Sequence, residues 1–422
     1  MWRLLAVIGL VGCSASHAAP APADAGAAPA AAPPACGCEA TGARIEGEGN
    51  PGEPSPHDQL ALAKTKWKDL PDWGTDKLAE AVPSFLKSCA KLAELKPDDP
   101  AGVDGHGGRA KQWKKACAAA AKVPAGDDAA ARAMFEAEFT PYVAAGKKGA
   151  TGKLTGYYVQ EIHASRKKTG AFQTAVLARP KDLLMIDLGQ FTNDAHGKRL
   201  WGRTVNGELV PYYTREEIRK GKLDDQHLEL MYVDDPVDLL FAQIEGSAKA
   251  RFDDGTVVWL EFDGKNGRAY KGVGGVLRGS GELKAGQGTM QGIRKWFHDH
   301  PARYHEIVDQ DASYVFFKES KEPGAIGSQK TVLTTQRSAA VDRAFFAMST
   351  PIFVEGHVPV VGTPNTTTVW HHLLIAQDTG AGIVGAVRAD IYWGDDRAAE
   401  EIGGRMGGPG RYWVLLPNGI EK

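Results

Sequence analysis

The stretch after Gly149 restricts the fold most, because short apolar and β-branched runs alternate there with glycine turns. Examples are GKLTGYYVQEI from Gly152, DGTVVWLEF from Asp254, TPIFVEG from Thr350 and RYWVLLP from Arg411. Many short strands at this spacing are typical of barrels and sandwiches. Two helical interludes, TREEIRKGKL and GTMQGIRKWFHDHP, interrupt the run. The sequence therefore predicts an all-β core with helices attached.

The segment 60–143 has helical spacing instead. A second predicted helix carries Trp113 and Cys117, and a third begins at Asp127 or Asp128. The first helix has one apolar face, made of Leu78, Val82, Phe85, Cys89 and Leu92. Stripes of this kind indicate packing rather than a cofactor site.

Two cysteines of this helical segment, Cys89 and Cys117, fit an oxidising compartment. We expect a disulfide between them, and two buried free thiols are the alternative. Cys36 and Cys38 lie further towards the N-terminus, and the sequence leaves their partners open.

The N-terminus, MWRLLAVIGLVGC, has one Arg followed by an apolar run too short to cross a bilayer. Residues 1–12 are expected to be a signal peptide, and the small residues before Cys13 resemble the lipobox of bacterial lipoproteins. The resemblance implies cleavage before Cys13 and its lipidation. A cysteine that merely follows a conventional signal peptide is the alternative. Ser14 favours an outer-membrane lipoprotein facing the periplasm.

Residues 13–56 are rich in Ala, Pro and Gly and show no helical or alternating period. Proline prevents a packed helix there, so we expect a disordered tether. Fifty basic and fifty-two acidic residues nearly cancel over the whole chain. Nucleic acid is therefore not an expected partner, because phosphate contacts require concentrated positive charge.

Several kinds of catalytic motif are missing from the sequence. There is no phosphate-binding glycine loop, no HExxH and no pair of CxxC units, so neither a cofactor nor a metal is expected. His371 and His372 are adjacent, so on a strand they face opposite sides and are interpreted as structural. The three serines considered as nucleophiles lack a GxSxG context: Ser247, Ser313 and Ser338.

The stretch AQDTGAGIVGAVRADIYWG, from Ala376 to Gly394, keeps two acids in a glycine-rich apolar run, Asp378 and Asp390. A strand through RADIYWG would place Asp390 and Tyr392 on one face and apolar side chains on the other. Carboxylates, glycines and aromatics are what proteins use to cut or hold sugars.

Six ordered blocks resemble the signature motifs of the MltA-type membrane-bound lytic murein transglycosylases. They are LTGYY, DDPVDLLFAQIEGSAKARFDDG, NGRAYKGVGGVL, SYVFFKES, LTTQRSAAVD and AQDTGAGIVGAVRADIYWG. The resemblance implies a mainly β fold: a catalytic double-psi β-barrel with an inserted smaller β-barrel and an N-terminal helical segment. The implied division is 57–157 and 320–422 for the catalytic part and 158–319 for the insert.

The resemblance also implies the substrate, the glycan strands of peptidoglycan, and the general acid, Asp390. The machinery of cell-wall synthesis or division is a further expected partner. The residues expected to contact sugar are Thr155, Tyr157, Tyr158, Ser247, Asp378, Gly380 and Tyr392. The chain departs from the family pattern at Val159-Gln160, at Glu245-Gly246-Ser247-Ala248 and at Ala381-Gly382.

One carboxyl suffices for the implied reaction, because the attacking C6 hydroxyl belongs to the substrate itself. Such an acid must carry a proton near neutral pH, which burial beside apolar groups favours. Asp378 is interpreted first as turn architecture. A glycan hydrolase on the same fold would need a second carboxylate, for which Asp378 and Glu245 are the candidates. A non-catalytic peptidoglycan-binding lipoprotein is the other alternative.

Overall fold

The computed structural model describes residues 58–420, apart from 103–105, 193–198, 285–286, 364 and 381. The predicted signal peptide, the tether, Cys13, Cys36 and Cys38 lie outside the described residues. Within the described ranges, no helix combines the length and the apolar composition that crossing a bilayer requires.

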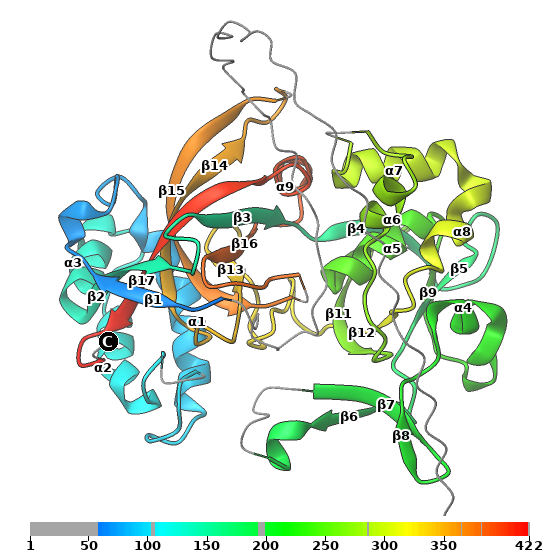
Figure 1. The fold of residues 1–422 in the computed structure, drawn as a ribbon, viewed down its shortest axis with the longest axis horizontal. Coiled ribbons are helices and arrows are strands. Elements are labelled where there is room, and N and C mark those ends of the chain that lie inside the picture. The colour runs from blue at the N-terminus through cyan, green and yellow to red at the C-terminus, as the bar shows by residue number, and fades with distance from the viewer. Residues whose placement is uncertain are drawn as a thin grey trace, which may run out of the picture. The chain divides into compact units, whose positions relative to one another are not determined.

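Eight strands of the described chain form one sheet, in the order β1-β2-β17-β14-β15-β13-β16-β3 (Figure 1). Their bounds are β1 (Ala61–Lys64), β2 (Phe139–Ala145), β3 (Gly152–Tyr157), β13 (Ser338–Val341), β14 (Pro351–Pro359), β15 (Thr367–Asp378), β16 (Arg388–Tyr392) and β17 (Gly407–Pro417). Because β17 also pairs with β3, the strands from β17 round to β3 close into a barrel. The pairs β13–β15 and β16–β3 are parallel within this mainly antiparallel ring, which fits the expected double-psi topology.

Part of the barrel sequence is apolar without alternation, and the surroundings of β15 give the reason. Leu374 and Ala376 lie in the barrel core. Leu373 and Ile375 point the other way and belong to a second cluster shared with the N-terminal helices. Successive side chains of a strand face opposite sides, and here both sides are covered. The helices therefore bury the outer face of the barrel.

The helical segment lies beside the barrel in Figure 1. Its elements are the short turns η1 (Trp67–Asp69) and η2 (Leu78–Glu80) and the helices α1 (Ala81–Ala93), α2 (Ala110–Ala120) and α3 (Asp128–Glu138). Asp127 caps α3 by accepting a hydrogen bond from the Ala130 N–H at 2.9 Å. A disulfide between Cys89 and Cys117 joins α1 to α2. The packing is aromatic, with fully buried rings of Phe85, Trp113 and Phe135.

Between β3 and β13, the described chain builds two further sheets, ordered β12-β11-β10-β4-β9-β5 and β6-β7-β8. Their strands are β4 (Gln160–Ser165), β5 (Thr174–Leu177), β6 (Leu184–Asp187), β7 (Arg199–Val205), β8 (Glu208–Val210), β9 (Glu229–Val233), β10 (Ser247–Phe252), β11 (Val257–Lys265) and β12 (Val315–Glu319). A bridge between Ala178 and Phe317 brings the β5 and β12 ends of the larger sheet together. This sheet therefore curls towards a second barrel.

Helices cover this inserted region as well. They are α4 (Arg215–Glu217), η6 (Ile218–Lys222), α5 (Pro236–Glu245), α6 (Val273–Gly279), α7 (Met290–Asp299) and α8 (Tyr304–Val308), with the shorter turns η4 (Leu188–Gln190), η7 (Asp224–Gln226) and η8 (Pro301–Arg303). The apolar face of α7, with Ile293, Trp296 and Phe297, is buried against α5 and α6. One helix, α9 (Arg397–Gly403), follows β16. The predicted fold class, mainly β with an inserted second β region, is confirmed.

Candidate active site

Asp390 lies in the middle of β16, between β13 and β3. It is aligned with Ala340 of β13 and with Thr155 of β3. Its chain neighbours Ala389 and Ile391 are fully buried in the barrel core. Successive side chains alternate along a strand, so Asp390 points to the opposite face, where 19% of its side chain is exposed. The structure therefore has the arrangement that RADIYWG predicts, with an acidic side chain on one strand face and apolar side chains on the other.

The Asp390 carboxyl has two close partners. Thr155 Oγ1 donates a hydrogen bond to Oδ1 at 2.6 Å, and Arg388 Nη2 lies 3.9 Å from Oδ2. Burial raises the pKa of Asp390, and the charge of Asp378 adds to the rise, whereas Arg388, the Thr155 hydroxyl and Lys153 oppose it. The net shift of the pKa is upward, so this carboxyl keeps its proton to higher pH than an exposed aspartic acid does.

Asp378, the last residue of β15, accepts hydrogen bonds on both carboxylate oxygens. Oδ1 accepts from the Ser328 N–H, the Ser328 hydroxyl and the Thr379 N–H, at 2.9, 2.7 and 2.8 Å. Oδ2 accepts from the Tyr157 hydroxyl at 3.0 Å. Four donated hydrogen bonds hold this carboxyl in place. The geometry therefore favours a structural and electrostatic role for Asp378 over proton transfer.

Two tyrosines connect these acids. Tyr157 of β3 and Tyr392 of β16 are aligned partners, and their ring centroids are 5.4 Å apart. Burial raises the pKa of Tyr157 well above its ordinary value, so its hydroxyl remains a donor to Asp378. The two rings therefore pack against each other on the neighbouring strands that also carry Thr155 and Asp390.

The other predicted sugar-contacting residues lie in different surroundings. Tyr158 is only 3% exposed and packs in the barrel core, with its hydroxyl 3.2 Å from Gln160 Oε1. Tyr392 is buried to the same extent, with 3% of its surface exposed. Ser247 is buried at the start of β10, and the Gly380 carbonyl accepts from the Ile383 N–H in the turn after β15. The predicted residues that gather around Asp390 are Thr155, Tyr157, Asp378 and Tyr392.

Three residues of this region were not predicted from the sequence. Ser328 binds Asp378 from a loop that carries no motif, so only the tertiary fold reveals it. Lys249 of β10 reaches across to Asp395, just after β16, with Nζ 2.7 Å from Oδ2. Arg388 could have been identified, because a residue two positions before Asp390 on a strand shares its face.

The adjacent histidines of β15 have separate partners, in line with their interpretation as structural. His371 Nδ1 lies 3.0 Å from Asp72 and Nε2 lies 3.3 Å from Glu355. His372 Nδ1 is bonded to the His371 carbonyl, and its ring stacks on Trp370. Across the part of the chain that the structure describes, no group of three or more His, Cys, Asp or Glu side chains is placed to hold a metal ion.

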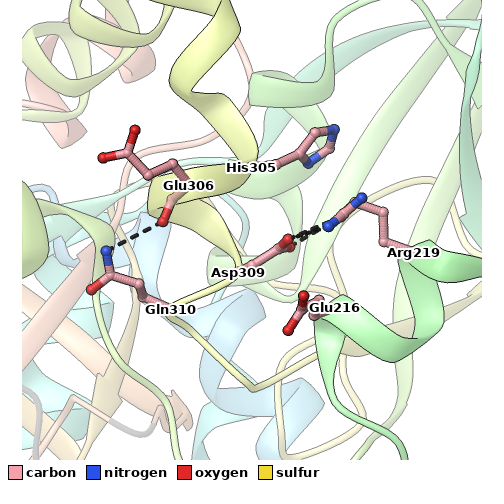
Figure 2. A pocket seen from close by; sticks show the side chains of 6 residues that line it. All are labelled: Glu216, Arg219, His305, Glu306, Asp309 and Gln310. Carbon is pink, nitrogen blue, oxygen red and sulfur yellow. Dashed lines mark hydrogen bonds and ion pairs between the residues drawn. The ribbon is translucent and has the colours of Figure 1, made fainter.

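Two surface hollows lie outside this cluster of acids. One, of about 430 Å³, is lined only by inserted-region residues: Glu216, Arg219, His305, Glu306, Asp309 and Gln310. Figure 2 shows two pairings among its polar groups: Arg219 donates to Asp309, and Gln310 donates to the Glu306 carbonyl. The other, of about 330 Å³, is lined in part by Gly407, which is aligned with Thr155. Only the second hollow therefore begins next to the strands that carry the acids.

Comparison with known proteins identifies the family of this barrel. The family model MltA, described as the MltA specific insert domain, matches residues 153–318, and the 3D domain model matches residues 337–416. The structure of the lytic transglycosylase LtgG of Burkholderia pseudomallei is 33% identical, with a TM-score of 0.55. The match covers 87% of this chain and 99% of that one. The chain belongs to the MltA family.

Further members of the MltA family are similar over different lengths. The membrane-bound lytic murein transglycosylase structure from Agrobacterium tumefaciens has a TM-score of 0.74 at 27% identity, covering 85% of this chain and 98% of that one. Membrane-bound lytic murein transglycosylase A of Vibrio cholerae serotype O1 is 34% identical over 213 residues, or 50% of this chain. The chain spans 56% of the length of that curated relative.

The two MltA-family matches divide the site between them. The insert match begins inside β3, so it includes Thr155 and Tyr157, and it ends in β12. The 3D match covers β13 to β17 and includes Asp378, Asp390 and Tyr392. The parallel pairing of β3 with β16 joins the two parts of the site.

Proposed function

We propose that this protein is a lytic transglycosylase. It cleaves the β-1,4 bond between N-acetylmuramic acid and N-acetylglucosamine in peptidoglycan and leaves 1,6-anhydro ends. The observation that carries the proposal is the environment of Asp390, a partly exposed carboxyl on a barrel strand whose burial favours the protonated form. The MltA-family relatives are named lytic murein transglycosylases, which supports the same reaction.

In this reaction Asp390 acts twice. Its proton goes to the glycosidic oxygen as the bond to the anomeric carbon breaks, and the C6 hydroxyl oxygen of the same muramyl residue bonds to that carbon. The Asp390 carboxylate then accepts the C6 hydroxyl proton and returns to its acid form. The nucleophile is already attached to the substrate, so proximity replaces a second catalytic carboxyl.

Neighbouring groups support each state of Asp390. Thr155 fixes Oδ1, so that Oδ2 is the oxygen free to meet the substrate. Arg388, 3.9 Å from Oδ2, stabilises the carboxylate that exists between the two proton transfers. We keep as proposed contributors to the sugar site, through direct contact or through the shape of its walls, Tyr157, Tyr158, Ser247, Asp378, Gly380 and Tyr392.

The proposal includes the cellular setting. Lipidation at Cys13 would anchor the protein to the outer membrane, and residues 13–56 would let the folded part reach peptidoglycan in the periplasm. The relatives named membrane-bound support an anchored protein. We also propose 57–157 with 320–422 as the catalytic domain and 158–319 as the insert, with cell-wall synthesis or division proteins as partners.

The products of digestion test the reaction. Purified protein is incubated with isolated peptidoglycan sacculi, and the released muropeptides are analysed by mass spectrometry before and after borohydride reduction. Products that carry 1,6-anhydro ends and resist reduction support the proposal. Reducible ends would indicate a hydrolase instead, and binding without release would indicate a non-catalytic protein.

The Asp390→Asn variant tests the assignment of the acid. The amide keeps the shape but cannot donate the proton, so turnover should fall by roughly 10²–10⁴-fold while sacculus binding is retained. Asp225→Asn is the matched control, because Asp225 is an exposed carboxyl of the inserted region. An Asp390→Asn variant with near-normal turnover would overturn the assignment.

A further inference from the structure

Glu245 enters the region of Asp390 from the inserted part of the chain. It is the last residue of α5, and Gly246 ends that helix in a left-handed conformation with φ 77°. Strand β10 begins at the next residue and runs parallel to β4, with Ala248 aligned with Gln160. Since β4 follows β3 after only two residues, this register brings the end of α5 close to Tyr158, which directly follows β3. Lys249 then fixes β10 to Asp395, beyond β16.

The Glu245 side chain is partly exposed and lacks a partner among the described residues. No hydrogen bond or ion pair joins its carboxyl to another side chain or to the backbone of that part of the chain. An unpaired carboxyl in a largely buried place costs stability unless it is protonated or meets a ligand. Its partial exposure leaves it open to a ligand.

Burial and two nearby acidic side chains disfavour the charged form of Glu245. Burial raises the pKa of Glu245 well above its ordinary value, and the charges of Asp390 and Asp378 add to the rise. Two further titratable groups, the phenols of Tyr158 and Tyr270, lie within electrostatic range. Strand β10, which follows α5, carries Lys249, and this cation is already paired with Asp395 and Glu161. The Glu245 carboxyl therefore keeps its proton to higher pH than an exposed glutamic acid does, and in that acid form it is a hydrogen-bond donor.

A protonated carboxyl in such a place selects the kind of ligand atom it can bind. Anionic ligand groups would be disfavoured next to the acidic side chain of Asp378, and the acid form of Glu245 has a proton to give. Acetamido carbonyls and hydroxyls of a glycan are neutral acceptors of the right kind. We propose that Glu245 is a second sugar-binding residue of the site, which donates a hydrogen bond in its acid form to a neutral glycan oxygen held in front of Asp390.

This inference rests on the proposed function, since it assumes that a glycan occupies the face of Asp390. Two roles that a second carboxyl could have predict different effects of a glutamine replacement. As a donor, Glu245 can be replaced by glutamine, which has the same size and keeps N–H donors. As the base of a hydrolase, it would have to be ionised, and glutamine could not replace it.

Equilibrium binding of a soluble N-acetylglucosamine oligomer tests the donor role, measured by calorimetry in the Asp390→Asn background so that no turnover intervenes. Glu245→Ala should weaken binding by about tenfold, the loss of one good hydrogen bond. Glu245→Gln should bind within about threefold of its parent. Glu229→Gln is the matched control, because Glu229 is an exposed carboxyl of β9.

The pH dependence gives a second readout. As pH rises through the raised pKa of Glu245, the parent should lose the donor and bind the oligomer less tightly, whereas Glu245→Gln should not. Unchanged binding by Glu245→Ala would overturn the proposal, and so would Glu245→Gln binding as poorly as Glu245→Ala. If wild-type protein releases no anhydro products, the proposed reaction fails, while the binding series still decides the role of Glu245.

Discussion

Asp378 and Asp390 lie in one row across the barrel, because both are aligned with Ala340 from opposite sides. Aligned residues of neighbouring strands point to the same face, so the two carboxyls and the small side chain between them share that face. Two strand spacings separate their backbones by about 10 Å. At that distance the charge of Asp378 still acts on Asp390, and it does so in a partly buried place.

Replacing Asp378 by asparagine should therefore shift the activity towards lower pH. The negative charge of Asp378 contributes to the raised pKa of Asp390, so its removal lowers that pKa. Turnover requires the acid form of Asp390, and the high-pH limb of the kcat/KM profile should move to lower pH. Unchanged kcat/KM at low pH within about tenfold would separate this effect from unfolding, whereas an unmoved limb would contradict it.

The Thr155→Val variant should move the high-pH limb of the kcat/KM profile in the opposite direction, to higher pH. Thr155 donates to the charged form of Asp390 and lowers its pKa, so a side chain of similar shape without the hydroxyl lets that pKa rise. The low-pH plateau of kcat/KM should fall by about tenfold, because the acid loses its orientation. Thr140→Val, which removes a remote hydrogen bond to Asn418, serves as the control. A limb that moves to lower pH would contradict the assignment.

Asp58 is expected to stabilise the turn that leads into β16. Its carboxylate accepts from the Ala386 N–H at 2.7 Å and from the Lys147 and Gln59 N–H groups at 2.9 Å. Burial acts to raise the pKa of Asp58, but these three N–H donors together outweigh it and lower the pKa. The stabilisation is therefore present above the unfolded pKa and is lost as pH falls through the lowered folded pKa.

The Asp58→Ala variant should lose about 1 kcal/mol of unfolding free energy at neutral pH, because the partly buried Ala386 N–H loses its acceptor. Urea denaturation at neutral pH and again at strongly acidic pH measures the loss. The difference between variant and wild type should shrink in acid, where the wild-type carboxyl is protonated. An equal difference at both pH values would show that the carboxylate charge is not the cause.

Removal of the Cys89–Cys117 disulfide should destabilise the protein without changing its chemistry. The bond closes a loop with a sequence separation of 28 residues. Loop-closure entropy for that length corresponds to about 3–4 kcal/mol. The Cys89→Ala/Cys117→Ala double variant should unfold at lower urea concentration, as should wild-type protein under reducing conditions. Equal stability of the oxidised and reduced wild-type protein would rule out this contribution.

The sequence alone was enough for the general architecture. Runs such as those containing Leu154 and Val414 follow local rules of strand spacing and glycine turns, and the α1 stripe through Phe85 follows helical spacing. The family resemblance implies the acid at Asp390, and strand alternation separates its side chain from those of Ala389 and Ile391. These features depend on contacts close along the chain.

The tertiary structure decided the features that depend on pairing between distant strands. Strand order places Asp378 and Asp390 on either side of Ala340, and it brings Thr155 to Asp390, Ser328 to Asp378 and Glu245 to both acids. It also set the exposure of two tyrosines that the family resemblance assigns to the sugar site, Tyr158 and Tyr392, at 3% each. Spacing along the chain sets which face of a strand a side chain takes. Only the closure of the barrel sets which groups that face meets, and the burial that results raises the pKa of Asp390.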